Sequence, residues 1–404
     1  MLDVEPAVTL PPNLESLANP YQVIRDLGLY DVPPQPVKWR TERGFFVARY
    51  RDVWDALTDL RLSNDSSNLD TSTGEVPRDI IPPGNILTLD PPDHTRLRHL
   101  VQAGFTQRRI NQLTVRIQRV VDELLDAIAA RGESEFIQDF AAPLPTAMIT
   151  EILGVPYEDR AEFMIWARAM LTPPADETDT KQLAVMHDAQ RKMSAYFVEH
   201  IERIKQQPTD SILWALISAR AEGGDKLSDT ELLSMMIVLL VAGFETTINL
   251  LGTGMHQLAR NPDIWAALKS DPALVPNAVE EMLRFDGPIF VDIFRYAKED
   301  VELNGTRIPR GSRVYLSLGS ANRDPGQFTN PDTFDIYRDD IRHVAFGRGV
   351  HLCIGAPLAR MEVKIAFTSI VQRFSELRLA VPESNLRWRH HTMRGLADLP
   401  VTVA

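Results

Sequence analysis

The sequence predicts a mainly α-helical protein with a small β region, and three observations support this fold class. Apolar residues recur at helical spacing through the middle of the chain, for example at Leu113, Ile117 and Val121. The 28 prolines concentrate at 11–36, at 77–92 and around 309–331, which leaves long uninterrupted stretches between them. Short strand-like runs occur only late in the chain, so helices must form most of the core.

The predicted elements follow from local signals. Ser228 and Glu231 form a capping box that starts a helix with an apolar centre, and Asn261-Pro262 ends it. Pro276 suits the first turn of another helix. Predicted helices, in chain order, cover 94–106, 107–130, 136–153, 157–170, 180–206, 229–260, 277–285 and 357–374. Predicted strands cover 301–303, 307–309, 314–318 and 377–381, with a hairpin-like turn around 394–396. Residues 1–13 are expected to form a loose arm, and 322–344 an irregular segment with five Asp residues.

Composition limits the function classes. The chain has 404 residues and a net charge of −12, which disfavours a non-specific nucleic-acid or anionic-membrane binder. The longest apolar run, 235–244, has ten residues and is too short to span a bilayer. One cysteine excludes an intramolecular disulfide and a Cys-rich metal site, so a cytoplasmic protein is expected. No linker or repeat divides 1–404, which predicts a single domain.

The single cysteine lies in a glycine-rich segment that opens a helix. The segment reads Phe346-Gly347-Arg348-Gly349-Val350-His351-Leu352-Cys353-Ile354-Gly355. Its glycines allow tight turns and close approach to a flat or charged ligand, and a helix N-terminus stabilises a thiolate. An inert buried cysteine is the alternative, which the glycine frame disfavours. The pattern Phe-Gly-x-Gly-x-His-x-Cys-x-Gly resembles the haem-binding signature of the cytochrome P450 family, the haem-thiolate monooxygenases. The chain is similar to the soluble bacterial members of this family.

The resemblance implies a cytochrome P450 fold, with haem b between the long central helix and the cysteine-loop helix. Cys353 would then be the iron ligand, and dioxygen the co-substrate. The cofactor-binding residues implied in this loop are Phe346, Gly347, His351, Cys353 and Gly355. The family pattern His-x-x-x-Arg matches His94 and Arg98, which lie on one helical face and would hold the haem propionates together with Arg295 and His351.

A short segment with polar residues interrupts the apolar centre of the long helix and reads Ala242-Gly243-Phe244-Glu245-Thr246-Thr247. A glycine, an acid and two hydroxyls lower the stability of a buried helix. Residues that are unfavourable for the local structure are typical of functional sites. The segment resembles the family's oxygen-activation motif. Ala242 and Gly243 would contact the haem, Thr246 would donate a hydrogen bond to dioxygen, and Glu245 would relay protons. The alternative is a core helix in which Thr246 bonds its own backbone.

Glu281 and Arg284 have the spacing of an ion pair on one helical face. On its own this pattern indicates an ordinary surface pair. By resemblance it is the buried pair that braces the chain before the cysteine loop, with Arg338 as a third, structural member. The family's pattern also implies a substrate pocket formed by Leu240, Val241, Ile289, Phe290, Val291, Ile293 and Met393, with the 64–88 loop. Core packing is an equally open interpretation of each side chain.

The resemblance implies insertion of one atom of dioxygen into a small apolar substrate by hydroxylation, epoxidation or O-dealkylation. No nucleotide-binding turn occurs, so no reductase is expected in the chain, and electrons would come from a separate ferredoxin or flavodoxin. Arg96, Arg108, Arg109, Arg348, Arg360 and Lys364 are expected to form a basic patch for this donor on an otherwise acidic monomer. A peroxide-driven peroxygenase, a haem sensor and a cysteine hydrolase are weaker alternatives, because the Glu245-Thr246 pair and the glycine frame do not suit them.

Overall fold

The computed structural model describes residues 5–14, 17–40, 42–73, 84–102, 104–171, 179–219, 224–291, 293–389 and 393–404. The α-helices in these ranges are α1 (Pro20–Asp26), α2 (Tyr50–Ala56), α3 (Asp93–Gln102), α4 (Gln107–Ala129), α5 (Pro143–Ile152), α6 (Arg160–Leu171), α7 (Thr180–Gln206), α8 (Ile212–Ser218), α9 (Asp229–Arg260), α10 (Pro262–Ser270), α11 (Val275–Asp286), α12 (Leu318–Ala321) and α13 (Ala356–Arg373).

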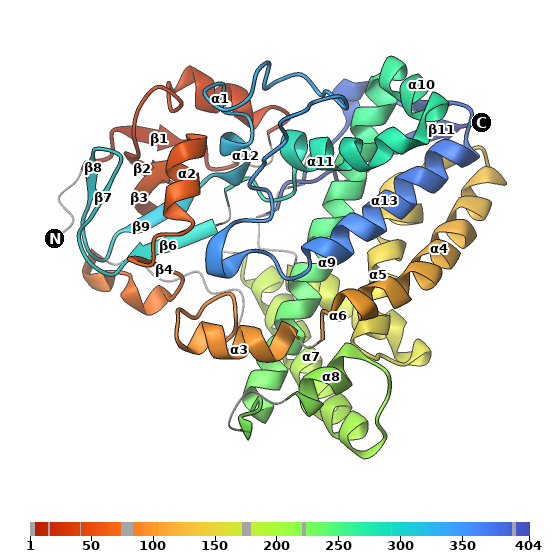
Figure 1. The fold of residues 1–404 in the computed structure, drawn as a ribbon, viewed down its shortest axis with the longest axis horizontal. Helices are drawn as coiled ribbons and strands as arrows, with labels where there is room; N and C mark the ends of the chain where they lie inside the picture. The colour runs from red at the N-terminus through yellow and green to blue at the C-terminus, as the bar shows by residue number, and fades with distance from the viewer. Residues whose placement is uncertain are drawn as a thin grey trace.

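The strands are β1 (Val8–Leu10), β2 (Gln35–Trp39), β3 (Glu42–Val47), β4 (Leu62–Ser63), β5 (Glu133–Glu135), β6 (Ile293–Ala297), β7 (Val301–Leu303), β8 (Thr306–Ile308), β9 (Arg313–Leu316), β10 (Leu377–Leu379) and β11 (Pro400–Val403). Strands β1–β4 and β6–β9 lie on one side of the molecule and most helices on the other, whereas β11, which pairs with β5 and β10, lies on the helical side (Figure 1). The largest sheet has the order β1-β2-β3-β9-β6-β4, and β3 pairs with β9 in parallel, with Phe45 opposite Val314. Segments distant in sequence therefore meet in one sheet.

The long helix α9 is the centre of the helical part. The Ser228 side chain accepts the Glu231 amide and the Glu231 carboxylate accepts the Ser228 amide, as the capping box predicts. By length and composition alone α9 could cross a membrane, with a mean hydropathy of 1.8 over its most apolar window. However, 83% of that window is buried. Since α5, α7, α11 and α13 all contact α9, it is the core helix around which the others pack.

Three predictions about local structure were wrong. The described part of the N-terminal arm is not loose, because Val8–Leu10 forms β1 and pairs in parallel with β2. The helix predicted over 136–153 is broken: a π-helical turn covers Ile137–Ala141, and α5 begins at Pro143, which has no N–H for the preceding turn. Strands were expected only late in the chain, yet β1–β5 all lie before residue 136.

The segment 322–344 is irregular, as predicted. It contains turns and bends but no helix or strand, and it runs from the end of α12 to the cysteine loop. Several of its residues are nevertheless buried, including Phe328, Phe334 and Ile336. Side-chain interactions must therefore replace the backbone ladder that a helix or strand would supply.

Candidate functional site

The cysteine loop is a tight turn that ends at α13. The Cys353 amide donates to the Phe346 carbonyl at 2.9 Å, and Gly347 and Gly349 have φ of 68° and 72°, a left-handed conformation that favours glycine. A Cβ on Gly349 would also lie 3.2 Å from the Leu57 carbonyl oxygen. Glycines therefore occur here because the turn needs left-handed backbone and, at Gly349, a close approach to Leu57.

The Cys353 thiol has solvent-accessible surface but is surrounded by protein atoms on most sides. This desolvation raises the pKa of the thiol, while hydrogen bonds from the Gly355 and Ala356 amides and the charges of Arg98 and Arg360 oppose the rise. The donors are therefore placed to stabilise a thiolate once a cation binds the sulfur. In the described part of the chain, no group of three or more His, Cys, Asp or Glu side chains is placed to hold a metal.

Beside this loop, two histidines and two arginines gather. The His94 and His351 rings lie 4.1 Å apart between centroids, Arg295 is buried, and the Arg98 guanidinium donates to the Leu352 carbonyl at 2.6 Å. Both ring nitrogens of buried His94 and Nδ1 of His351 have no hydrogen-bond partner in the structure.

The electrostatics of this group favour an anionic ligand. Burial, Arg295 and His94 lower the pKa of His351 to about 3, and burial lowers the pKa of Arg295 to about 10. The nearby Asp90 carboxylate opposes these shifts but does not outweigh burial, and it also accepts the Ser63 hydroxyl at 2.6 Å and lies 3.5 Å from the Lys298 ammonium. These three histidine nitrogens have no partner among the described residues, and burial disfavours the charged forms of Arg295 and His351. A ligand that carries carboxylates, such as haem with its propionates, would satisfy these groups.

The centre of α9 presents backbone rather than side chains. Ala242 and Gly243 are exposed although most residues on both sides of them are buried. The half-buried Thr246 donates its hydroxyl hydrogen to the Ala242 carbonyl at 2.8 Å, so the backbone-bonded alternative is the state observed. α9 continues without interruption through this segment, and the exposed strip fits a flat ligand lying against the helix.

Glu245 points away from solvent and forms an ion pair that the sequence did not reveal. Its side chain is 3% exposed, and Oε1 accepts the Arg389 guanidinium and, at 3.5 Å, the Asn249 amide. Burial raises the pKa of Glu245, and the charge and hydrogen bond of Arg389 oppose the rise. Arg389 lies 144 residues away in sequence, so no spacing could have identified it.

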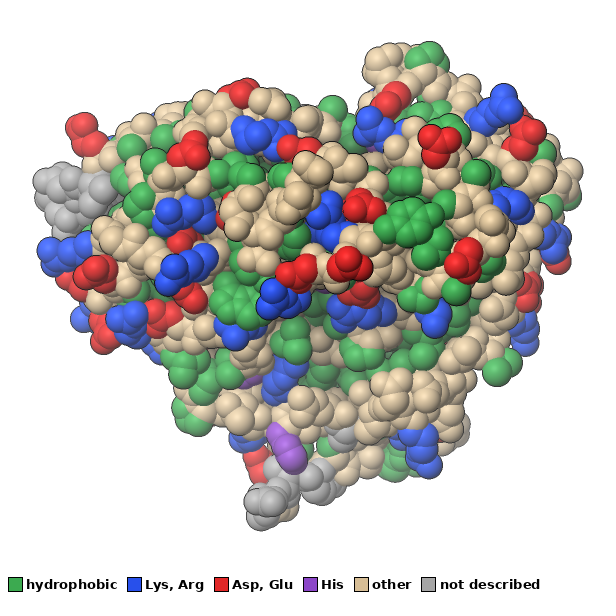
Figure 2. Space-filling view, turned by 45° about the horizontal axis from the view of Figure 1, so that its top comes forward, with side chains coloured by type: hydrophobic (Ala, Val, Ile, Leu, Met, Phe, Trp, Pro, Cys, Tyr) green, Lys and Arg blue, Asp and Glu red, His purple; other side chains and the backbone are tan. Residues whose placement is uncertain are grey.

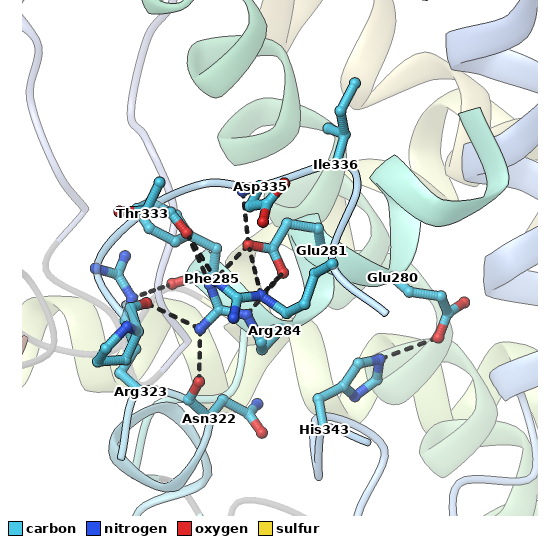
Figure 3. A network of polar contacts seen from close by, with 12 residues as sticks. Glu280, Glu281, Arg284, Phe285, Asn322, Arg323, Thr333, Asp335, Ile336 and His343 are labelled. Atoms are coloured by element: carbon cyan, nitrogen blue, oxygen red, sulfur yellow. Dashed lines mark hydrogen bonds and ion pairs between the residues drawn. The ribbon is translucent and has the colours of Figure 1, made fainter. Parts of the chain in front are cut away.

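Figure 3 shows the network that orders the segment 322–344. Arg284 donates to both Glu281 oxygens at 2.7 Å, and both side chains are fully buried. The same guanidinium donates to three carbonyls of the irregular segment, those of Asn322, Pro331 and Thr333. Arg338 lies 3.3 Å from Glu281 Oε2, so the structure brings together all three residues expected in this brace. A single buried carboxylate and two guanidiniums thus fix the path of the chain toward the cysteine loop.

The residues expected to line a substrate pocket divide into two groups. Leu240 and Val241 are buried in the core around α9, and Phe290 and Val291 pack in the core under β2 and β3. Their burial agrees with core packing, the open alternative, and the pocket assignment of these four stays a prediction. Ile289, Ile293 and Met393 keep partial exposure. Residues 74–83 of the 64–88 loop lie outside the described residues.

Three of the six residues of the expected basic patch form ion pairs with acids. Arg96 pairs with Asp225 and Glu231, Arg109 with Asp210, and Arg360 with Glu280, while the Arg348 guanidinium lies 3.8 Å from the Trp54 ring centroid. Arg108 and Lys364 are exposed. Positive and negative side chains are interspersed on the face in Figure 2, with no large area of one sign. Acidic partners therefore neutralise half of the expected local patch.

The described geometry agrees with comparisons against known proteins. A family model described as "Cytochrome P450" matches residues 60–391. Cytochrome P450 107B1 of Saccharopolyspora erythraea is 42% identical over 88% of each chain, and the monooxygenase PikC of Streptomyces venezuelae is 42% identical over 90% of this chain and 86% of that protein. The solved structure of PksS of Bacillus subtilis has a TM-score of 0.87 at 36% identity, covering 96% of this chain and 97% of that one. The predicted fold and resemblance are confirmed, and the chain belongs to the cytochrome P450 family.

Proposed function

We propose that this protein is a haem-thiolate monooxygenase that inserts one atom of dioxygen into a small apolar substrate. The observation that supports this most directly is the group of buried His94 and Arg295 and half-buried His351 beside the cysteine loop, in which three histidine ring nitrogens have no hydrogen-bond partner in the described part of the chain. Such a group is costly to fold without an anionic ligand. The names of relatives support the same activity, since PikC is called a cytochrome P450 monooxygenase.

Haem b fits the residues present. Cys353 would bind the iron, His94, Arg98, Arg295 and His351 would hold the propionates, and Phe346, Gly347 and Gly355 would shape the sulfur side. The exposed Ala242 and Gly243 would lie against the opposite face. When bound, the haem supplies the redox chemistry with dioxygen, and the protein positions the substrate and supplies protons.

Two residues of α9 would serve proton transfer. Thr246 Oγ1 donates to the Ala242 carbonyl, and a rotation about χ1 would turn the same hydroxyl toward a ligand beside the exposed strip. Glu245 holds a carboxylate inside the core, where a proton can be taken up and released away from bulk water. We therefore keep both residues as the proposed catalytic pair.

Carbon monoxide tests the thiolate ligation. The reduced, haem-loaded protein should show a strongly red-shifted Soret band with carbon monoxide, and Cys353→Ser should abolish that band. A folded, haem-loaded wild-type protein without the band would contradict the proposal. To separate monooxygenase from peroxygenase chemistry, turnover with a reductase, a donor protein and dioxygen is compared with turnover on hydrogen peroxide alone.

The electron donor we propose is a separate ferredoxin or flavodoxin, and the protein would work as a cytoplasmic monomer. Arg108 and Lys364 are the two residues of the expected patch that are classed as exposed. Arg108→Glu and Lys364→Glu should each slow donor-dependent reduction, most strongly at low salt. Lys192→Glu, on α7, is the control, and an equal slowing in that variant would contradict a local docking site.

For the substrate we propose an apolar secondary metabolite, with hydroxylation, epoxidation or O-dealkylation as possible reactions. Relatives of the chain include a 6-deoxyerythronolide B hydroxylase and a polyketide biosynthesis cytochrome P450, which support a macrolide or another polyketide as the first compounds to test. Terpenes, fatty acids, steroids and aromatic compounds form the comparison panel. Spectral shifts of the haem on titration with each compound rank them by affinity, and no shift with any polyketide would contradict the class.

A further inference from the structure

Residues 387–389 pair with residues 395–397, and we call these two segments the C-terminal hairpin. The hairpin brings Arg389 to Glu245 of α9. Trp388 and Leu396 form an isolated antiparallel bridge, the Arg389 amide donates to the Gly395 carbonyl at 3.0 Å, and the Ala397 amide donates to the Arg387 carbonyl at 2.8 Å. These backbone bonds fix the hairpin, and with it the base of the Arg389 side chain.

Buried Arg394 attaches this hairpin to the rest of the fold. Its guanidinium donates to the Asp286 carboxylate at 2.5 Å and to the Leu17 and Ala18 carbonyls at 2.7 and 3.1 Å. It also lies 3.7 Å from the Trp388 ring centroid. The hairpin is therefore held by the end of α11 and by the N-terminal segment, so its position does not depend on the Glu245 ion pair.

The hairpin also lies directly against α9, one turn after Glu245. A Cβ on Gly395 would be 2.1 Å from Asn249 Oδ1 and 2.4 Å from Asn249 Cγ, so only glycine fits this approach. Asn249 in turn donates to Glu245. The helix and the hairpin thus fix the two partners of the ion pair separately, and this fixed geometry reduces the entropy lost when the pair forms.

The pair lies at a boundary between core and solvent. The Glu245 side chain is 3% exposed, whereas the Arg389 side chain is 26% exposed. Charged groups that act on Glu245 are Arg389 on the hairpin and, more weakly, Arg168 on α6. Without Arg389, burial would favour the neutral acid more strongly, because burial penalises the carboxylate and the opposing charge would be gone.

We propose that Arg389 is a positioning residue for the reaction: it keeps the Glu245 carboxylate ionised at neutral pH and holds it on the hairpin side of α9. Glu245 then returns to the same ionised state after each proton that it accepts and passes on. This inference rests on the proposed function for its consequence in turnover, but the protonation state of Glu245 can be measured without turnover.

Infrared spectroscopy of the substrate-free, haem-loaded protein provides the test. In Arg389→Met, the C=O band of a protonated carboxyl should appear at pH 7, and Glu245→Gln in the same background should remove it. Loss of a nearby opposite charge raises a carboxyl pKa by about one to three units, which means about 10-fold to 1000-fold more protonated acid. Arg389→Lys should restore the ionised state, and Arg389→Gln replaces the Met variant if that variant does not fold.

Arg387→Met is the matched control, because Arg387 lies on the same hairpin and pairs with Asp398, and its side chain is 75% exposed. It should show no new carboxyl band. The pH profile of turnover should shift upward in Arg389→Met and stay unchanged in the control. An ionised Glu245 in Arg389→Met, or the same band in Arg387→Met, would overturn the inference. The carbon monoxide spectrum of each variant is recorded separately, so loss of haem ligation is distinguished from loss of the ion pair.

Discussion

Replacing Arg284 by lysine should destabilise the fold far more than the retained charge suggests. The Arg284 guanidinium donates five hydrogen bonds: two to Glu281 and three to carbonyls of the segment 322–344. A lysine ammonium has three donors on a flexible stem, so at least two of the five hydrogen bonds are lost. A hydrogen bond to a charged group contributes about 1.5–3 kcal/mol, which gives a loss of about 3–6 kcal/mol. This is a large share of the roughly 5–15 kcal/mol of a typical domain.

Urea unfolding followed by circular dichroism measures this loss. Arg307→Lys is the control, because Arg307 pairs with Asp300 at the surface and should tolerate the change without measurable loss. A loss below about 1 kcal/mol in Arg284→Lys would refute the reasoning that the fork geometry of the guanidinium is needed for these hydrogen bonds. Hydrogen exchange adds a local readout, since amides of 322–344 should lose protection before those of α9.

Three further outcomes are expected. His94→Leu should leave the unfolding free energy of haem-free protein unchanged or higher, because both ring nitrogens are buried without partners, yet haem should dissociate faster in absorbance assays. Gly349→Ala should lower the melting temperature more than Gly305→Ala; both have left-handed φ, but only Gly349 lies close to other atoms. Glu280→Gln should destabilise the protein at pH 7, since hydrogen bonds from His343 and Arg360 outweigh burial and hold the pKa of Glu280 at about 2. That stability is present above the unfolded value of 4.5, so the difference should vanish as the pH falls toward 2.

Features encoded by short-range spacing could be predicted from the sequence. The capping box at Ser228 located the start of α9, and the periodic stretches located α4 and α7 to within a residue or two of their observed bounds. The glycine pattern around Cys353 also required no tertiary information, since the left-handed turns are local. These elements are determined by forces between residues a few positions apart.

Long-range pairings could not be predicted in the same way. Strand β1 forms because Val8–Leu10 finds an edge of the sheet, although its neighbouring prolines suggest an irregular arm. Arg389 reaches Glu245, and Arg394 reaches Asp286, only because the hairpin folds back across the molecule. Likewise, the burial of Phe290 depends on contacts such as Tyr21, whose ring lies 5.3 Å away between centroids, and no periodicity encodes them.

The Asp286 carboxylate has a consequence for how the protein is made in the cell. It accepts the Tyr21 hydroxyl at 3.1 Å and the Arg394 guanidinium, so residues 21, 286 and 394 meet at one point. A ribosome adds residues in order at about 5–20 per second, so Arg394 is added roughly 20–75 s after α1 has been synthesised. During that interval Tyr21 and its apolar neighbours lack their native cover. Nascent chains stalled before residue 394 should therefore bind chaperones through the N-terminal region, and release should follow once the hairpin has emerged.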